Sequence, residues 1–280
     1  MEIEFKNVSF SYKKFNCVEK NILNNINIKF KKNKINAIIG PNGSGKTTLV
    51  KLIQGFLEPT NGKILVNGIK VDNNVDFLDY NFNVGIVMQQ PSINFIGKTV
   101  REELEYYIKL YHYHVNEMEK RIIDSLKMVE MDTKYLDQNL LKLSDTEKRK
   151  VAIASLLIVN PKVIILDEPI IGLNYSEKKN LIKLIKMLKN RYKKTIIIAS
   201  NNIDFIYEIS DYVVLLNNKE VVSTGSKFEI FKNVELLKKC NIRTPKLIEF
   251  SNKVLSKKNK KLGYRDDIND LIKDIYRNVK

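Results

Sequence analysis

The sequence predicts an α/β fold in which helices cover a largely parallel β-sheet. Over residues 35–216, short apolar runs alternate with longer stretches that carry helical spacing, and this order is typical of strand–helix–strand units. A glycine-rich turn follows the first of these runs. The run at 163–167 is apolar up to its last residue, as expected of a strand that is buried on both faces.

The N-terminal third is expected to hold several strands, because apolar and polar residues alternate in much of it. A turn at Pro59–Gly62 separates a helix from the strands that follow it. The expected strands span 2–10, 22–30, 35–39, 63–66 and 84–88, and the helix runs from Lys46 to about Gln54.

The rest of the chain is expected to be mainly helical around three further strands. The helix from Ser144 to Val159 ends before Asn160-Pro161, because the residue before a proline disfavours helix. The other expected elements are helical spacing over 99–130, strands at 163–167, 195–199 and 212–216, helices at 175–190 and 202–210, and a separate helical tail over 233–280 with helices at 245–256 and 266–279.

Composition excludes several classes of protein. Two cysteines, Cys17 and Cys240, cannot form a disulfide framework and lack zinc-type spacing, so a reduced intracellular setting is expected. No signal-peptide core and no apolar run long enough to span a bilayer is visible. The net charge of +16 indicates either a basic binding surface or codon bias toward Lys, Asn and Ile. We favour codon bias and expect no nucleic-acid partner, since no reader motif is present.

The strongest chemical motif is the segment that follows the strand at 35–39. Its residues, Gly40, Pro41, Asn42, Gly43, Ser44, Gly45, Lys46 and Thr47, match GxxxxGK[ST] with a strand before and a helix after. The glycines allow backbone N–H groups to converge on phosphate oxygens at the positive end of the helix. Lys46 is expected to reach the β- and γ-phosphates, the Thr47 hydroxyl to bind Mg²⁺, and Thr48 to join the nucleotide site.

A second motif lies at the end of the apolar strand at 163–167. Asp167 is delivered to the carboxyl end of the sheet, where open α/β folds bind their ligands. We expect Asp167 to hold Mg²⁺ through water and Glu168 to polarise the attacking water as a general base.

The order of motifs resembles that of an ABC-type ATPase. It consists of the P-loop, Gln89, Leu143-Ser144, Asp167-Glu168 and Gly172-Leu173. The resemblance implies that Gln89 contacts Mg²⁺ and a transmembrane partner, and that Tyr12 stacks on adenine. It also implies a P-loop core with an antiparallel β portion. The implied ABC domain covers 1–231 with a helical subdomain at about 99–160, and a helical extension covers 232–280.

Three motifs depart from the family pattern. The signature LSGGQ is replaced by Leu143 followed by Ser144, Asp145, Thr146 and Glu147. Asn174 replaces the D-loop aspartate and Asn201 replaces the switch histidine. Asp145 would bring a negative charge toward a phosphate, and two like charges about 4 Å apart repel by at most about 4 kcal/mol at a dielectric of about 20. Either this is tolerated drift in a working ATPase, or the subunit is specialised as one half of a heterodimer.

Residues 94–100 and 242–256 are similar to the ATPase subunits of energy-coupling factor (ECF) transporters, which import vitamins or metal ions. This resemblance implies an ATP- and Mg²⁺-dependent translocase subunit, peripheral at the cytoplasmic face of the membrane. The implied partners are a second ABC ATPase, a transmembrane coupling subunit that docks near Gln89–Arg101, and a substrate-binding membrane subunit.

Two rival functions stay open. One is a degenerate ATP-binding subunit that stabilises or regulates its complex with little hydrolysis, and the other is an ABC protein that acts on nucleic acid or ribosomes. His112 and His114 are not expected to bind metal, since their rings would point apart on a helix and no third ligand lies nearby.

Overall fold

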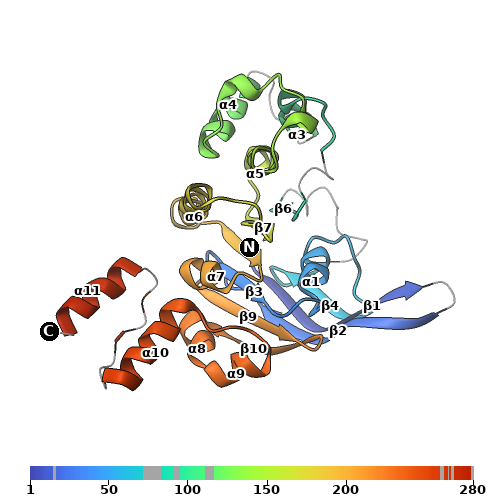
Figure 1. Cartoon of the computed structure of the whole chain (residues 1–280). Helices are drawn as coiled ribbons and strands as arrows, with labels where there is room; N and C mark the ends of the chain where they lie inside the picture. The colour runs from blue at the N-terminus through green and yellow to red at the C-terminus, as the bar shows by residue number, and fades with distance from the viewer. Residues whose placement is uncertain are drawn as a thin grey trace.

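Two β-sheets and a group of helices build the molecule, seen in Figure 1. The structure is a computed structural model, and it describes residues 1–14, 17–71, 83–90, 95–110, 117–258, 262–263, 265 and 268–278. His112 and His114 lie outside the described residues. In the described part, no helix is both long and apolar enough to cross a membrane.

The larger sheet is parallel except at one edge, and its strand order is β10-β9-β3-β8-β7-β6. Its strands are β3 (Ile35–Ile39), β6 (Val84–Val87), β7 (Val163–Asp167), β8 (Thr195–Ala199), β9 (Tyr212–Asn217) and β10 (Glu220–Ser226). The predicted parallel sheet is therefore confirmed. Strand β10 was not expected: it pairs antiparallel with β9 at the edge, and its residues are all exposed or half-buried, so it lacks the apolar run of a central strand.

The smaller sheet is antiparallel and has the order β2-β1-β4-β5. It consists of β1 (Ile3–Lys14), β2 (Cys17–Lys29), β4 (Asn61–Val66) and β5 (Ile69–Lys70), so the first two strands are longer than the sequence suggested. Helix α1 (Lys46–Ile53) shares one hydrophobic cluster with both sheets, in which Leu49 and Ile53 meet Phe5 and Ile165. Burial between two sheets fixes the start of α1, and with it the glycine-rich turn.

A group of helices lies beside the β6 edge of the large sheet in Figure 1. Helices α3 (Val100–Leu110) and α4 (Met118–Met128) pack against α5 (Asp145–Val159). Two more helices, α6 (Tyr175–Asn190) and α7 (Ile203–Ile209), follow β7 and β8 and share the hydrophobic cluster of α3, α4 and α5. These elements confirm the helical spacing over 99–130 and the helix that begins near Ser144.

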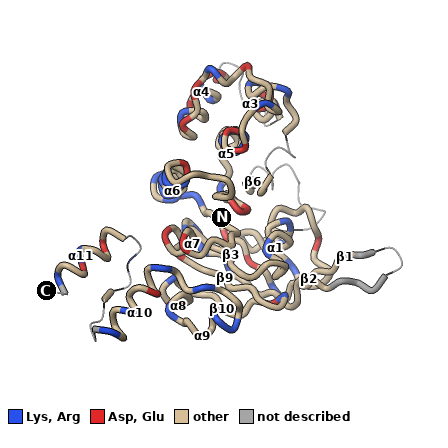
Figure 2. The backbone as a smooth tube through the Cα atoms, viewed as in Figure 1, with Lys and Arg blue, Asp and Glu red and all other residues tan. Residues whose placement is uncertain are grey.

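The C-terminal segment holds α8 (Lys227–Lys232), α9 (Val234–Lys239), α10 (Lys246–Lys258) and α11 (Ile268–Asn278). Leu237, Cys240 and Ile248 are buried in the main cluster, so the segment around α9 packs on the body of the protein, whereas α11 lies at its periphery in Figure 1. The boundary near residue 231 stays a prediction. Lys and Arg are spread along most elements in Figure 2, interspersed with acidic residues on α3, α4 and α5.

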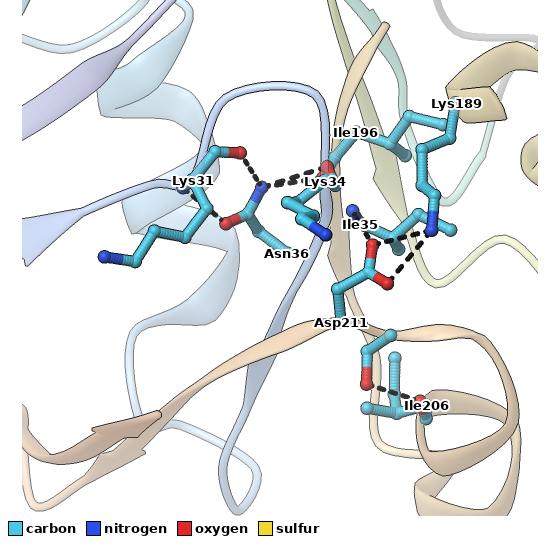
Figure 3. Close-up of polar contacts among 9 residues, drawn as sticks. Lys31, Lys34, Ile35, Asn36, Lys189, Ile196, Ile206 and Asp211 are labelled. Atoms are coloured by element: carbon cyan, nitrogen blue, oxygen red, sulfur yellow. Dashed lines mark hydrogen bonds and ion pairs between the residues drawn. The ribbon is translucent and has the colours of Figure 1, made fainter. Parts of the chain in front are cut away.

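Buried polar groups fix the amino end of the central strands, as Figure 3 shows. The Asn36 amide accepts from the Lys31 N–H at 2.8 Å and donates to the Lys34 carbonyl at 3.1 Å. The Asp211 carboxylate accepts from the Ile35 N–H at 2.8 Å and from Lys189 Nζ at 3.0 Å. These bonds hold Ile35 and Asn36, the first residues of β3, in place. The other end of β3 therefore brings the glycine-rich turn that follows Ile39 to a defined position.

Candidate nucleotide-binding site

The candidate site lies where three neighbouring parallel strands end. Strands β3, β8 and β7 lie side by side, so the loops that follow Ile39, Ala199 and Asp167 meet at one edge of the sheet. This is the edge at which open α/β sheets bind ligands. The glycine-rich turn, the segment after β8 and the two acidic residues, predicted separately, are thereby brought together.

The glycine-rich turn has a backbone that only glycine adopts easily. Gly45 has a φ of +101°, and a Cβ at this position would lie 2.5 Å from Leu23 Cδ2. Helix α1 starts directly after it, with no side-chain cap and no acidic residue in its first turn. The first N–H groups of α1 are thus available to an anion, as the helix-terminus argument requires.

Two buried side chains in this turn fit a phosphate. The Lys46 ammonium is buried and donates to the Gly40 carbonyl at 2.8 Å and to the Pro41 carbonyl at 3.1 Å. Its pKa is lowered by burial, against the opposing effect of Glu168 and Asp167. The Ser44 hydroxyl oxygen is buried and has no hydrogen-bond partner among the described residues. A buried unsatisfied hydroxyl is costly, and a phosphate oxygen would satisfy it.

Asp167 and Thr47 form the part of the site that fits Mg²⁺. Asp167 is only 3% exposed, and burial is the main cause that raises the pKa of its carboxyl. A hydrogen bond from Thr47 lowers the same pKa, which places the two oxygen ligands in contact. Mg²⁺ prefers one or two such oxygens and takes its remaining ligands from phosphates and water. The donor set therefore fits the ion, and no group of three His, Cys, Asp or Glu ligands occurs in the described residues.

The Glu168 carboxylate is held on both oxygens. Oε1 accepts from the Asn201 backbone N–H at 2.8 Å, and Oε2 accepts from the Ser200 hydroxyl at 2.8 Å. Asn201 Nδ2 donates to Asn42 Oδ1 of the glycine-rich turn at 2.6 Å. Glu168 itself has a φ of +46°, a strained backbone that is common at functional sites. Sequence reasoning missed Ser200, although its place directly after a buried parallel strand was a usable signal.

Gln89 lies just beyond strand β6 and its side chain is exposed. Its carbonyl accepts from Arg149 Nη2 at 3.4 Å, and Arg149 Nη1 donates to the carbonyls of Pro169 and Ile171 at 2.8 and 2.6 Å. Sequence reasoning also missed Arg149, because nothing local distinguishes it from the cations beside it. Tyr12 is 38% exposed and packs edge-on against Phe10 with ring centroids 4.8 Å apart, which leaves ring surface open for stacking.

The altered motifs act as helix caps. The Ser144 hydroxyl accepts from the Glu147 N–H at 3.3 Å, and the Glu147 carboxylate accepts from the Ser144 N–H at 2.7 Å, so the two form a capping box at the start of α5. Hydrogen bonds from Ser144 lower the pKa of the Glu147 carboxyl. Asn174 caps α6 in the same way with Glu177. Asp145 is exposed in the first turn of α5, whereas the neighbouring Thr146 is half-buried.

Comparisons with known proteins agree with this geometry. A family model described as ABC transporter matches residues 23–171. The energy-coupling factor transporter ATP-binding protein EcfA2 of Clostridium perfringens is 35% identical over 88% of this chain and 87% of its own length. The ATP-binding cassette MJ0796, solved as a dimer in a post-hydrolysis state with ADP and Pi, is 28% identical with a TM-score of 0.73, covering 80% of this chain and 98% of that one.

A third protein, cbiO1 from Clostridium perfringens, is described as part of the ABC transporter complex cbiONQ. It is 28% identical and has a TM-score of 0.73, and the match covers 89% of this chain and 98% of that chain. Sequence, fold and the arrangement of the P-loop with Asp167 and Glu168 all lead to one conclusion. This chain belongs to the ABC transporter family and, within it, to the ATP-binding proteins of energy-coupling factor transporters.

Proposed function

We propose that this protein binds and hydrolyses ATP to energise the import of a vitamin or a metal ion through separate membrane subunits. It works as one half of a head-to-tail dimer at the cytoplasmic face of the membrane, to which it is peripheral. The observation that carries the proposal is the meeting of the P-loop, the Thr47–Asp167 contact and the doubly bonded Glu168 carboxylate at one sheet edge.

Each residue has a chemical role in this proposal. The P-loop residues Gly40 to Thr48 bind the phosphates, and Tyr12 stacks on adenine. Thr47, Asp167 and Gln89 hold Mg²⁺, which would neutralise charge on the phosphate oxygens. Glu168, fixed by two hydrogen bonds, accepts a proton from the attacking water.

Exposed apolar residues beside the altered motifs support a second ATPase subunit as partner. Leu141, just before the signature, is 81% exposed, and Ile171 and Tyr175, on either side of Asn174, are 48% and 74% exposed. Single exposed apolar residues are common on protein surfaces, but several that lie beside the motifs expected at a dimer interface fit a surface that another protein covers. In the proposed dimer, these residues lie against the partner ATPase.

The charge at the start of α5 favours a heterodimer. Asp145 and Glu147 already place two carboxylates in the first turn of this helix, where the signature of the family faces the phosphate of the partner subunit. A phosphate approaching there meets like charge, which disfavours two identical halves. A partner with an intact signature would instead complete the site built on Lys46 and Glu168.

A transmembrane coupling subunit is proposed to dock near Gln89–Arg101, and a substrate-binding membrane subunit completes the complex. Ile96 is 60% exposed, while the buried Glu103 carboxylate accepts from the Ile96 and Gly97 N–H groups, both at 2.8 Å. A fixed loop that presents an apolar side chain suits docking. Arg101 on α3 is paired with Glu119 on α4, at 2.8 Å, so its charge reversal would disturb the link between these helices as well as the interface.

The deciding experiment measures Mg²⁺-ATP turnover of this chain, alone and in its complex, for the wild type and for Glu168→Gln. If the proposal holds, the complex turns over ATP and Glu168→Gln removes most of that activity while ATP still binds. Lys46→Ala serves as the control that loses ATP binding. A complex whose turnover is unaffected by Glu168→Gln would contradict hydrolysis in this subunit.

Turnover that is unaffected by Glu168→Gln would point to an alternative function. In that case this subunit binds ATP and stabilises the complex while its partner hydrolyses ATP. The neutral side chain of Asn201 and the acidic start of α5 favour it. The fixed orientation of the Glu168 carboxylate favours hydrolysis, because a general base must be held within reach of its water.

A further inference from the structure

Arg149 is a buried cation that joins two loops of the site. It lies in the first half of α5 and is 6% exposed. Its guanidinium donates to the carbonyls of Pro169, Ile171 and Gln89. Gln89 is a predicted Mg²⁺ ligand, and Pro169 directly follows Glu168. One side chain therefore bonds both segments that flank the proposed catalytic centre.

The buried position of Arg149 is energetically unfavourable for a charged side chain. Its hydrogen bonds to Pro169, Ile171 and Gln89 go to neutral carbonyls, and burial lowers the pKa of the guanidinium, opposed by the charge of Asp145. Buried ions are costly unless paired, and an apolar side chain of similar volume is often at least as stable. Stability alone is a poor explanation for this arginine, whereas a planar fork that holds several acceptors in place is a good one.

Arg149 also lines a cavity between helices. A cavity of about 550 Å³ separates α5 and the end of α4 from α6, and Arg149, Ile153, Leu173 and Leu184 are among its lining residues. Both helices also contribute buried residues, such as Ile153 and Leu184, to the main hydrophobic cluster. The bonds from Arg149 to the loop before α6 add a directional polar link beside this apolar packing.

We propose that Arg149 is a positioning residue that couples the start of α5 to the Mg²⁺-ATP site of its own chain. It does so by holding Gln89 and the loop after Glu168 through their backbone carbonyls. The inference rests on the proposed function, because α5 begins at the signature residues Ser144 and Asp145 that face the ATP of the partner subunit. Through Arg149, a shift of α5 at the partner's site is transmitted to Gln89 and Glu168.

The test compares Arg149→Lys and Arg149→Gln with the wild type in the assembled complex. Arg121→Gln is the matched control, since Arg121 lies on α4, is solvent-accessible and is ion-paired with Glu117. Thermal melting first establishes that each variant folds. Turnover is then measured against ATP and Mg²⁺ concentration, and the affinity for a non-hydrolysable ATP analogue is measured with Mg²⁺ and with EDTA.

We expect Arg149→Lys to lower kcat about tenfold with an ATP KM within about twofold of the wild type. Mg²⁺ should improve analogue affinity less in this variant, whereas the affinity in EDTA should not change. Arg149→Gln should be worse than Arg149→Lys, and Arg121→Gln should behave as the wild type. Equal kcat and equal Mg²⁺ dependence in Arg149→Lys and wild type would overturn the inference while leaving the proposed function intact.

A second measurement uses the wild-type complex and so does not depend on a variant that folds. Hydrogen exchange with Mg²⁺ and the analogue should become slower at 169–173 and at the start of α5 together. Protection restricted to the P-loop would overturn the coupling. A complex with no Mg²⁺-dependent turnover and no analogue binding would overturn the proposed function itself. That result differs from an unchanged kcat in Arg149→Lys and from protection restricted to the P-loop, which overturn only the coupling.

Discussion

Glu168 Oε1 accepts its 2.8 Å hydrogen bond from the backbone N–H of Asn201, not from the side chain. A backbone donor does not depend on the side chain, so an asparagine where the family pattern predicts a histidine would leave this bond intact. The asparagine side chain instead bonds Asn42 in the P-loop at 2.6 Å. The orientation of the Glu168 carboxylate thus rests on the backbone of residue 201 and on the Ser200 hydroxyl.

The side chain of Asn201 should contribute to turnover as a neutral donor. We expect Asn201→Ala to lower turnover by about tenfold or more, since removing one such donor often costs that much or more. Asn201→His should match or exceed the wild type, because the backbone bond to Glu168 persists. Steady-state turnover of the complex tests both variants, and wild-type activity in Asn201→Ala would exclude a role for this side chain.

Ser200 should matter for chemistry more than for folding. Ser200→Ala removes the 2.8 Å bond to Glu168 Oε2 and leaves that carboxylate held at Oε1 alone, by the Asn201 N–H. Turnover should fall about tenfold, with ATP affinity unchanged and a stability cost of about 1 kcal/mol. Ser210→Ala is the matched control, because the buried Ser210 hydroxyl donates to the Ile206 carbonyl at 2.7 Å. It should lose similar stability and no turnover; equal losses of turnover would refute a specific role for Ser200.

Restoring glycines at the start of α5 should strengthen ATP-driven assembly. The double variant Asp145→Gly and Thr146→Gly removes one carboxylate and lets the backbone approach a phosphate, while the Ser144–Glu147 capping box remains. Each glycine should cost up to about 1 kcal/mol of stability. Analytical ultracentrifugation with ATP should show tighter association. Asp124→Gly on α4 controls for a glycine that replaces a helical acid, and the prediction fails if the two variants associate equally.

Gly45 should tolerate no side chain. An alanine there combines a φ of +101° with a Cβ 2.5 Å from Leu23 Cδ2, so the turn must shift and ATP affinity should fall at least about tenfold. Gly68→Ala is the control, because its φ is +83° but nothing lies within 4 Å of the added Cβ. Calorimetric titration with ATP should separate the two variants; retained affinity in Gly45→Ala would contradict the turn geometry.

Lys194 should make the protein more stable at alkaline pH. Burial and repulsion from Lys162 lower its pKa to about 8, although Nζ donates to Asn160 Oδ1 at 2.6 Å. Between about pH 8 and pH 10.5 the unfolded chain binds more protons at this site, so the free energy of unfolding rises with pH. The full rise is at most about 3 kcal/mol.

Urea unfolding at pH 7.5 and pH 10 measures this effect. Lys194→Gln should show a smaller rise between the two pH values than the wild type. Lys183→Gln, an exposed position on α6, should keep the wild-type rise. A wild-type rise in Lys194→Gln would assign the pH dependence to other groups.

Much of the fold and the P-loop could be predicted because the signals are local. The strands at 35–39, 163–167 and 195–199 were predicted at their observed bounds, since buried parallel strands are largely apolar. Strand β10 was missed because an edge strand has no such run. The length of β1 and β2 was underestimated for a related reason: their far ends gain pairing partners from each other, and that pairing is not written in either segment alone.

By itself, the sequence determined the alternation of strands and helices, the glycine turn and the identity of the acidic residues, because each depends on neighbours within a few positions. Only the tertiary structure decided that Ser200 and the Asn201 backbone hold Glu168, and that Arg149 joins Gln89 to the loop after Glu168. These pairs are separated by 20 to 60 residues in the chain. They meet because β8 lies between β3 and β7 and because α5 packs against β6, the neighbour of β7 in the sheet. Both the strand order and this packing involve distant segments, which no local pattern encodes.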